Sequence, residues 1–302
     1  MRLLRILLCA GLAAGAASTS ADELVRQVGR VVMRVDTRYA YPGGVLLVRV
    51  SASTRLGGVS AILDGRRTPL RPAGGLMRGL VPIALGTPPG WHTLGFEVAT
   101  RSRRAQRVPL QVPIDAHGYS PRAAVLPPAK LGLLNSRDTL RDARRLLQAL
   151  QAADPDSSPA GPLRAPVAGS TGVGFGGAQA YAGITRPIEL LKDAQYGEQH
   201  RGLDYDVPVG TPVLAPGAGR VLLCTWLAAT GWTIVIDHGL GVASAIFHLS
   251  EISVQPGQEL AAGTPLGRSG ETGLASHPHV HWGVYLNGVA VDPAVLMQGF
   301  QD

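Results

Sequence analysis

Two short stretches, His200-Arg201-Gly202-Leu203-Asp204 and His279-Val280-His281, carry the residue types of a metal site. Zinc binds imidazole nitrogen and carboxylate oxygen, and a zinc site that does chemistry takes three protein ligands and keeps one coordination position open. Two histidines and one aspartate from these stretches meet that number. We therefore expect a fold that brings two segments far apart in the sequence to one point.

The residues around these stretches indicate strands or loops. Gly202 and Pro208 disfavour a helix through the first stretch, which we place on a strand end or a loop. On a strand, His279 and His281 point to the same face because alternate side chains do so. One of them can bind a metal ion while the other stands beside it. His248, at the end of another predicted strand, supplies a further imidazole that need not be a ligand.

The chain is long enough for two domains and carries a positive charge. It has 302 residues, a formal net charge of +7 and a sequence pI near 9.9. Lysine occurs only at Lys130 and Lys192, so arginine carries almost all of the excess. Such a surface suits an anionic polymer. The densest arginine group, at positions 101, 103, 104 and 107, has no interleaved aromatic residues, so we expect no nucleic acid partner.

Residues 1–21 have the three parts of a cleavable export signal. Arg2 and Arg5 precede an apolar run at 6–14, and small residues follow at 19–21. The apolar run is shorter than the roughly 20 residues that span a bilayer, so we expect an exported protein without a stable transmembrane anchor. Removal of this leader leaves one cysteine, which excludes an intramolecular disulfide.

Residues 22–115 are expected to form an antiparallel β-sandwich. Short apolar runs recur there, and between them stand turn signals such as Pro42-Gly43-Gly44, Asp64-Gly65 and Pro88-Pro89-Gly90. Nothing in this region combines the residue types of a catalytic site. His92 in this region, and His117 just after it, are isolated and are expected to be ordinary surface or core residues.

Residues 116–170 are expected to form a proline-rich linker that contains a connector helix at about 136–153. Apolar residues recur three and four positions apart, at Leu140, Ala143, Leu147 and Leu150, and arginine and aspartate occupy the other face. Ser136 or the asparagine before it can cap the helix. Residues 171–302 then become rich in predicted strands, and Asn287-Gly288 indicates a hairpin turn.

The C-terminal part resembles the LytM/lysostaphin-type zinc metalloendopeptidases over about residues 170–297. The N-terminal part is more loosely similar to the immunoglobulin-like domain that precedes some of these domains. The resemblance is carried by five segments: His200–Asp204, Val207–Val213, Asp237–Gly239, Phe247–Ser250, and the run from Gly267 through Thr272-Gly273 to Pro278–Trp282.

The resemblance implies a mainly β, duplicated-hybrid-motif-like metallopeptidase domain with a narrow groove. It also implies zinc as cofactor and the peptide stems and cross-links of bacterial peptidoglycan as substrate, in the periplasm or outside the cell; we favour the periplasm. By matching position, His200, Asp204 and His281 would be the zinc ligands. His248 and His279 would be the unligated catalytic pair, and which of them is the general base is left open. We expect residues 22–153 to be dispensable for the chemistry.

Two positions depart from the family pattern, and two other functions are considered. Ile246 stands where the family often has tyrosine, and His277 stands where it often has glycine. One alternative is a non-catalytic envelope protein of the same fold that activates or recruits other wall hydrolases. The other is a structural zinc site in an adhesin, for which His277 is the available fourth ligand. His238, in the family's turn motif, is expected to be structural. The sequence predicts no oligomeric state.

Overall fold

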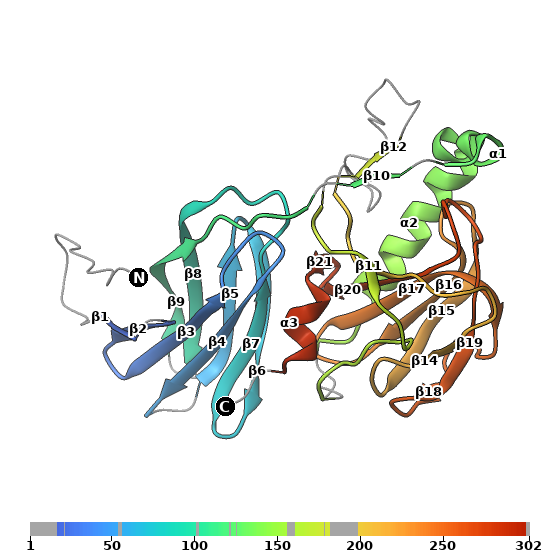
Figure 1. Cartoon of the computed structure of the whole chain (residues 1–302). Helices are drawn as coiled ribbons and strands as arrows, with labels where there is room; N and C mark the ends of the chain where they lie inside the picture. Colours follow the sequence, from blue (N-terminus) through green and yellow to red (C-terminus); the bar gives the residue numbers. More distant parts are fainter. Residues whose placement is uncertain are drawn as a thin grey trace. The chain divides into compact units, whose positions relative to one another are not determined.

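The computed structural model describes residues 17–20, 22–53, 56–100, 103–120, 122–124, 126–155, 161–177, 179–181 and 199–299 (Figure 1). These residues form two compact units. The first comprises the described residues up to Tyr41, with Val45–Ile83 and Pro88–Ala116, and the second comprises Pro42–Gly44, Ala84–Thr87 and the chain from His117 onward. The expected leader lies outside the described residues except for Ala17–Ser20. The mainly β fold class is confirmed.

The first unit is an antiparallel sheet in which the strand order is β1-β2-β3-β4-β7-β6-β5-β8-β9. Its strands are β1 (Ala17–Ser20), β2 (Glu23–Val28), β3 (Val31–Tyr39), β4 (Val45–Ala52), β5 (Leu56–Leu63), β6 (Arg66–Ala73), β7 (Leu76–Pro82), β8 (Gly90–Thr100) and β9 (Arg103–Ile114).

Strand β6 is the corner of this unit. Its first half, Arg66–Leu70, pairs with β5, whereas Arg71–Ala73 pair with β7. A strand that pairs with one neighbour at a time passes from one layer to the next, so the sheet folds over and encloses a core. That core is apolar and includes Met33 and Phe96, both fully buried. The predicted antiparallel N-terminal domain is confirmed.

The described residues of the second unit form four short or medium helices and the remaining strands. The helices are α1 (Pro128–Leu131), the 3-10 helix η1 (Gly132–Asn135), α2 (Arg137–Gln151) and α3 (Pro293–Met297). The strands are β10 (Arg122–Ala124), β11 (Thr171–Val173), β12 (Gln179–Tyr181), β13 (Leu203–Tyr205), β14 (Pro212–Leu214), β15 (Gly219–Leu227), β16 (Gly231–Asp237), β17 (Val242–Ile252), β18 (Glu259–Leu260), β19 (Pro265–Ser269), β20 (Val280–Leu286) and β21 (Val289–Val291).

The central sheet of this unit has the order β11-β13-β20-β17-β16-β15-β18, and β14, β19 and β21 pair at its sides. Strands β10 and β12 form a separate parallel pair. The predicted hairpin joins β20 to β21: Leu286 pairs with Val289, and the two turn residues have φ values of 50° and 77°. Positive φ at both central positions is the conformation that an Asn-Gly turn favours.

Helix α2 begins where the sequence provides a cap and packs on the sheet through one apolar face. The Ser136 side chain accepts a hydrogen bond of 3.0 Å from the Thr139 N–H. Leu146 and Leu150 are fully buried in a core that also contains Val235, Phe247 and Tyr285 of the sheet. Burying each leucine contributes about 1.5–3 kcal/mol.

The burial of one α2 residue differs from the sequence prediction. Asp142 was assigned to the solvated face, and this was wrong, because the helix buries it to 6% exposure. The helix belongs to the second compact unit, whose longest segment is the chain from His117 onward. We therefore propose that the C-terminal domain begins near residue 117.

No helix among the described parts of the chain has the length and apolar character needed to cross a membrane.

Candidate metal centre

Strand register brings Asp204 and His281 together. Asp204 of β13 is the direct partner of His281 in β20, and Phe247 of β17 pairs with His281 from the other side. Directly opposed residues have their side chains on the same face of a sheet. His200 lies just before β13, where its backbone N–H donates to Gly177 O (2.8 Å) and its carbonyl accepts from Gly176 N–H (2.7 Å). These bonds hold the loop residue beside the strand pair.

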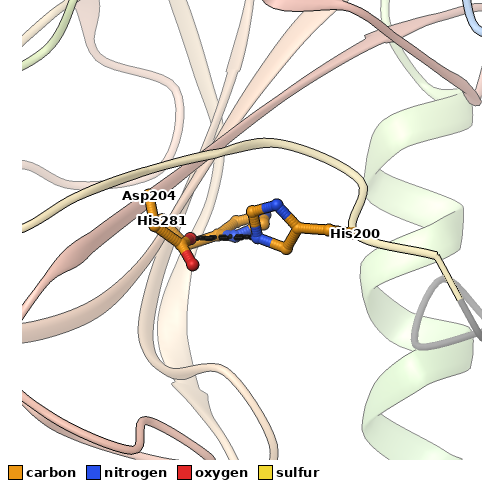
Figure 2. Close-up of side chains that lie close together, drawn as sticks. All are labelled: His200, Asp204 and His281. Carbon is orange, nitrogen blue, oxygen red and sulfur yellow. Dashed lines mark hydrogen bonds and ion pairs between the residues drawn. The ribbon is translucent and has the colours of Figure 1, made fainter. Parts of the chain in front are cut away.

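Three side-chain atoms converge in this cluster, as Figure 2 shows. His200 Nε2 lies 3.0 Å from Asp204 Oδ1 and 3.0 Å from His281 Nδ1, and the last two atoms are 2.8 Å apart. All three residues are buried. Because imidazole nitrogen and carboxylate oxygen are both zinc ligands, the donor set suits a zinc ion, and three protein ligands are the number in a zinc site with an open position.

The surroundings orient the two imidazoles of the cluster. His200 Nδ1 lies 2.8 Å from Gly174 O, which can only accept, so Nδ1 carries the proton and the Nε2 lone pair faces the cluster. The His281 ring is stacked on Phe247, with centroids 4.9 Å apart and planes inclined by 3°. Gly202 leaves the necessary room, because a Cβ there would stand 2.6 Å from His281 Nε2.

The electrostatics of the cluster favour metal-binding protonation states. Burial by itself would raise the pKa of the Asp204 carboxyl, but its contacts with the imidazoles of His200 and His281 outweigh burial and hold this pKa well below its ordinary value. Burial lowers the pKa of His281, more than the bond to Asp204 raises it. A metal ion needs an ionised carboxylate and a neutral imidazole, and at neutral pH both are present.

His248 and His279 stand next to this cluster. Their ring centroids are 4.7 Å apart, and His279 Nε2 lies 3.8 Å from Asp204 Oδ1. The centroid of the His248 ring is 6.3 Å from that of His281. The structure thus brings the five proposed ligands and catalytic residues into one site. They come from β13 and the loop before it, from β17, and from β20 and the residue that precedes it.

A β-bulge aims His248 at the site. The register between β16 and β17 shifts between the pairs Trp232–Leu249 and Ile234–Ile246, so Phe247 and His248 together oppose one residue. His248 has a φ of 64°, a left-handed conformation that is uncommon for a residue with a side chain. Bulges next to active sites re-aim side chains, and strained backbone concentrates at such sites.

Each of these two histidines donates through Nδ1 to a backbone carbonyl. His248 Nδ1 lies 2.8 Å from Thr272 O, and His279 Nδ1 lies 2.8 Å from His277 O. In the neutral form their Nε2 atoms therefore carry lone pairs. Burial, followed by the charges of His279 and His281, lowers the pKa of His248 well below its ordinary value.

The remaining residues of interest lie outside the cluster. His277 Nε2 contacts Asp206 Oδ1 at 2.9 Å, and the His277 side chain is 36% exposed. Ile246 is fully buried and pairs with Trp282, so it belongs to the core.

Buried His238 belongs to a chain of hydrogen bonds within the domain. His238 Nδ1 donates to Ala218 O at 2.8 Å. Its Nε2 accepts from Ser244 Oγ at 2.8 Å, and that oxygen in turn accepts from Trp282 Nε1–H at 3.0 Å. These contacts are structural in kind, and they leave no nitrogen of His238 free.

The sequence did not identify the groups that orient the imidazoles. Three are backbone carbonyls, those of Gly174, Thr272 and His277, and the fourth is the ring of Phe247. A carbonyl occurs at every position of the chain, so no residue type marks it. Phe247 could have been found, because its place beside His248 puts it on a strand next to the site.

Comparison with known proteins gives a family match in the C-terminal part of the chain and a structural match over most of it. Residues 198–293 match the family model described as Peptidase family M23. The crystal structure of a Pseudomonas aeruginosa protein named as a candidate peptidase M23 superposes with a TM-score of 0.60 and 29% identity, covering 86% of this chain and 96% of that one.

Two curated relatives match about a third of this chain. An uncharacterized metalloprotease of Haemophilus influenzae is 37% identical over 98 residues, which are 32% of this chain and 21% of that protein. Peptidoglycan DD-endopeptidase ShyA of Vibrio cholerae serotype O1 is 37% identical over 93 residues, 31% of this chain and 22% of that protein. The match therefore spans about a fifth of the length of each relative.

Proposed function

We propose, from the peptidase M23 domain that residues 198–293 form, that this protein is a zinc-dependent endopeptidase that hydrolyses peptide cross-links of bacterial peptidoglycan. One observation carries the proposal: two imidazole nitrogens and one carboxylate oxygen meet within 3.0 Å of one another, and two further imidazoles stand beside them. A closed structural zinc site would use a fourth protein ligand. The cluster of the described residues has three members.

In this proposal His200, Asp204 and His281 hold the zinc ion. Zinc, when bound, supplies a Lewis acid that polarises the scissile carbonyl and lowers the pKa of water to about 7. The carbonyl of Gly174 fixes the ring of His200, and Phe247 fixes that of His281, so both ligands are oriented before the ion arrives.

His248 and His279 move the proton. Each has its Nδ1 proton committed to a carbonyl, so its Nε2 accepts a proton from water and becomes a donor only afterwards. The imidazole that has taken the water's proton then returns it to the leaving amine. The other imidazole donates to the developing oxyanion only in molecules where its Nε2 has already taken a proton from solvent. The two histidines are alike in this respect, and the assignment of the general base stays open.

The choice of substrate rests on the relatives and on charge. ShyA, which is 37% identical over 93 residues, is named a peptidoglycan DD-endopeptidase, and the net charge of +7 suits an anionic wall polymer. Export follows from the expected leader at residues 1–21, and we favour the periplasm as the destination.

The test is digestion of purified sacculi. The zinc-loaded protein should release peptides with newly freed amines, detected by mass spectrometry; a chelator should stop the release, and added zinc should restore it. The alternative is a non-catalytic activator of other wall hydrolases. Zinc binding with intact His248 and His279 but no release from sacculi or soluble cross-linked peptides would favour that alternative.

A further inference from the structure

Two loops hold His248 in place. The backbone N–H of His248 donates to Thr230 O, in the loop between β15 and β16, at 2.8 Å. Its side-chain Nδ1–H donates to Thr272 O, in the loop between β19 and β20, also at 2.8 Å. The loops are also joined to each other, because Leu274 N–H donates to Ala229 O at 2.7 Å. The direction of this imidazole therefore depends on where both loops stand.

The segment from α1 to α2 reaches both of these loops. Lys130 Nζ of α1 donates to Glu271 O (2.7 Å) and Ala275 O (2.8 Å) in the second loop, one residue before and three residues after Thr272. Asp142 Oδ2 of α2 accepts from Ala228 N–H in the first loop at 2.9 Å. The Lys130 ammonium thus binds carbonyl oxygens of the second loop, and the Asp142 carboxylate binds a backbone amide of the first loop.

These two contacts are strong for their kind. Hydrogen bonds with one ionised partner are about twice as strong as neutral ones. Asp142 is 6% exposed, and the Lys130 side chain is 22% exposed. Burying a charge is costly unless it finds partners, so each side chain is committed to its loop. Lysine is also rare here, since the chain has only Lys130 and Lys192.

Helix α2 holds Asp142 rigidly against the first loop. Its buried face fixes Leu146 and Leu150 in the core of the sheet, on the same helix as Asp142. Arg141 occupies the other carboxylate oxygen of Asp142 at 3.2 Å, so the carboxylate cannot turn freely. The arrangement joins the helix, both loops and the imidazole in one chain of contacts.

We propose that Lys130 and Asp142 are positioning residues that clamp the two loops around His248, so that the segment from α1 to α2 is part of the active site. The proposal rests on the proposed function only in taking His248 as a catalytic imidazole. It means that residues 128–151 are required for full activity, in contrast to the expectation that everything before residue 154 is dispensable.

The experiment uses full-length, zinc-loaded protein. Lys130→Met and Asp142→Ala each remove one anchor and should lower kcat about 10- to 100-fold, because small displacements of a catalytic group have effects of this size. KM and zinc stoichiometry should stay unchanged, since neither anchor touches the three proposed ligands. Lys130→Arg, which can donate to two carbonyls, and Asp142→Asn, which keeps an acceptor, should restore most of kcat.

The matched control is Arg145→Gln, which removes a charge from an exposed position of the same helix. It should leave kcat unchanged. If Lys130→Met fails to fold, Lys130→Gln gives the same test. Its side-chain amide keeps a hydrogen-bond donor, so a smaller decrease in kcat is expected.

A spectroscopic measurement separates this proposal from the proposed function. In ¹⁵N-histidine-labelled protein, the Nδ1–H signal of His248 should be sharp in the wild type and broadened or lost in both anchor variants. If the wild type cuts no wall peptide, the proposed function fails, and this signal still tests the clamp. Unchanged kcat together with an unchanged His248 signal in both anchor variants would overturn the clamp.

Discussion

The two compact units bury different kinds of side chain. In the first unit the interior is apolar, and the buried polar residues among those the structure describes are two hydroxyl residues and Asp36, which pairs with Arg38 through hydrogen bonds of 2.6–3.1 Å. In the second unit the buried polar residues include five imidazoles and three carboxylates, namely His200, His238, His248, His279, His281, Asp142, Asp204 and Asp237.

The difference in buried side chains indicates that the interior of the first unit serves packing, whereas that of the second unit also serves chemistry. Buried ionisable groups cost stability, and a fold keeps them where they bind a metal, move protons or complete a hydrogen-bond network. The histidine of the first unit that the sequence singled out, His92, is bonded to Asp64 and to Pro88 O at its surface. The contrast predicts that changes at the buried imidazoles affect reaction and metal, whereas matched changes in the first unit affect only its own stability.

The largest effect is expected from His281→Ala. Removing one of three proposed ligands should abolish zinc retention and reduce hydrolysis of wall peptides to background, because each ligand of the site is essential to hold the ion. Zinc content after dialysis and peptide release measure the two effects. His92→Ala is the control from the first unit and should change neither. Retained zinc in His281→Ala would contradict the proposed ligand set.

A smaller effect is expected from His279→Ala. Loss of a proton-transfer group should lower kcat about 10²- to 10⁴-fold while most of the zinc is kept. Steady-state kinetics and metal analysis on the same preparation measure it. Equal loss of zinc in His279→Ala and His281→Ala would remove the distinction between proposed ligand and proposed proton carrier.

Stability should respond separately in the two units. Leu146→Ala opens a cavity under α2 and should lower the free energy of unfolding of the second unit by about 2–5 kcal/mol. Leu94, equally buried in the first core, gives the matched change Leu94→Ala. Denaturant titration that follows zinc release should show a lower midpoint for Leu146→Ala only. Equal midpoints in both variants would show that α2 is not part of the zinc-binding unit.

The smallest effect concerns pH. Burial lowers the pKa of His238, more than its bond to Ala218 O raises it. The unfolded chain, with a histidine pKa of about 6.5, then binds more protons than the folded one, so stability falls as the pH drops below that value. Denaturation of the zinc-free protein at about pH 7.5 and about pH 5.5 should give a smaller pH-dependent loss in His238→Gln than in the wild type. An equal loss in both would show that His238 does not titrate on unfolding.

Much of the fold and the site could be predicted from local sequence. Alternating apolar residues and turn signals indicated the antiparallel strands, and Asn287-Gly288 indicated its hairpin. The spacing of leucines indicated α2, which ends within a few residues of the predicted bounds. His200, Asp204, His248, His279 and His281 were singled out by type, because few side chains can bind zinc or carry a proton at neutral pH.

The tertiary structure decided what the side chains face. Asp142 looked like a surface residue of an amphipathic helix, and only the packing of α2 turned it towards Ala228 N–H. The bulge at His248 and the carbonyls of Gly174, Thr272 and His277 likewise have no mark in the sequence. A residue's type sets which chemistry it can do, whereas backbone donors and acceptors are the same at almost every position. Which of them meets an imidazole is therefore fixed by the register of strands and the packing of loops.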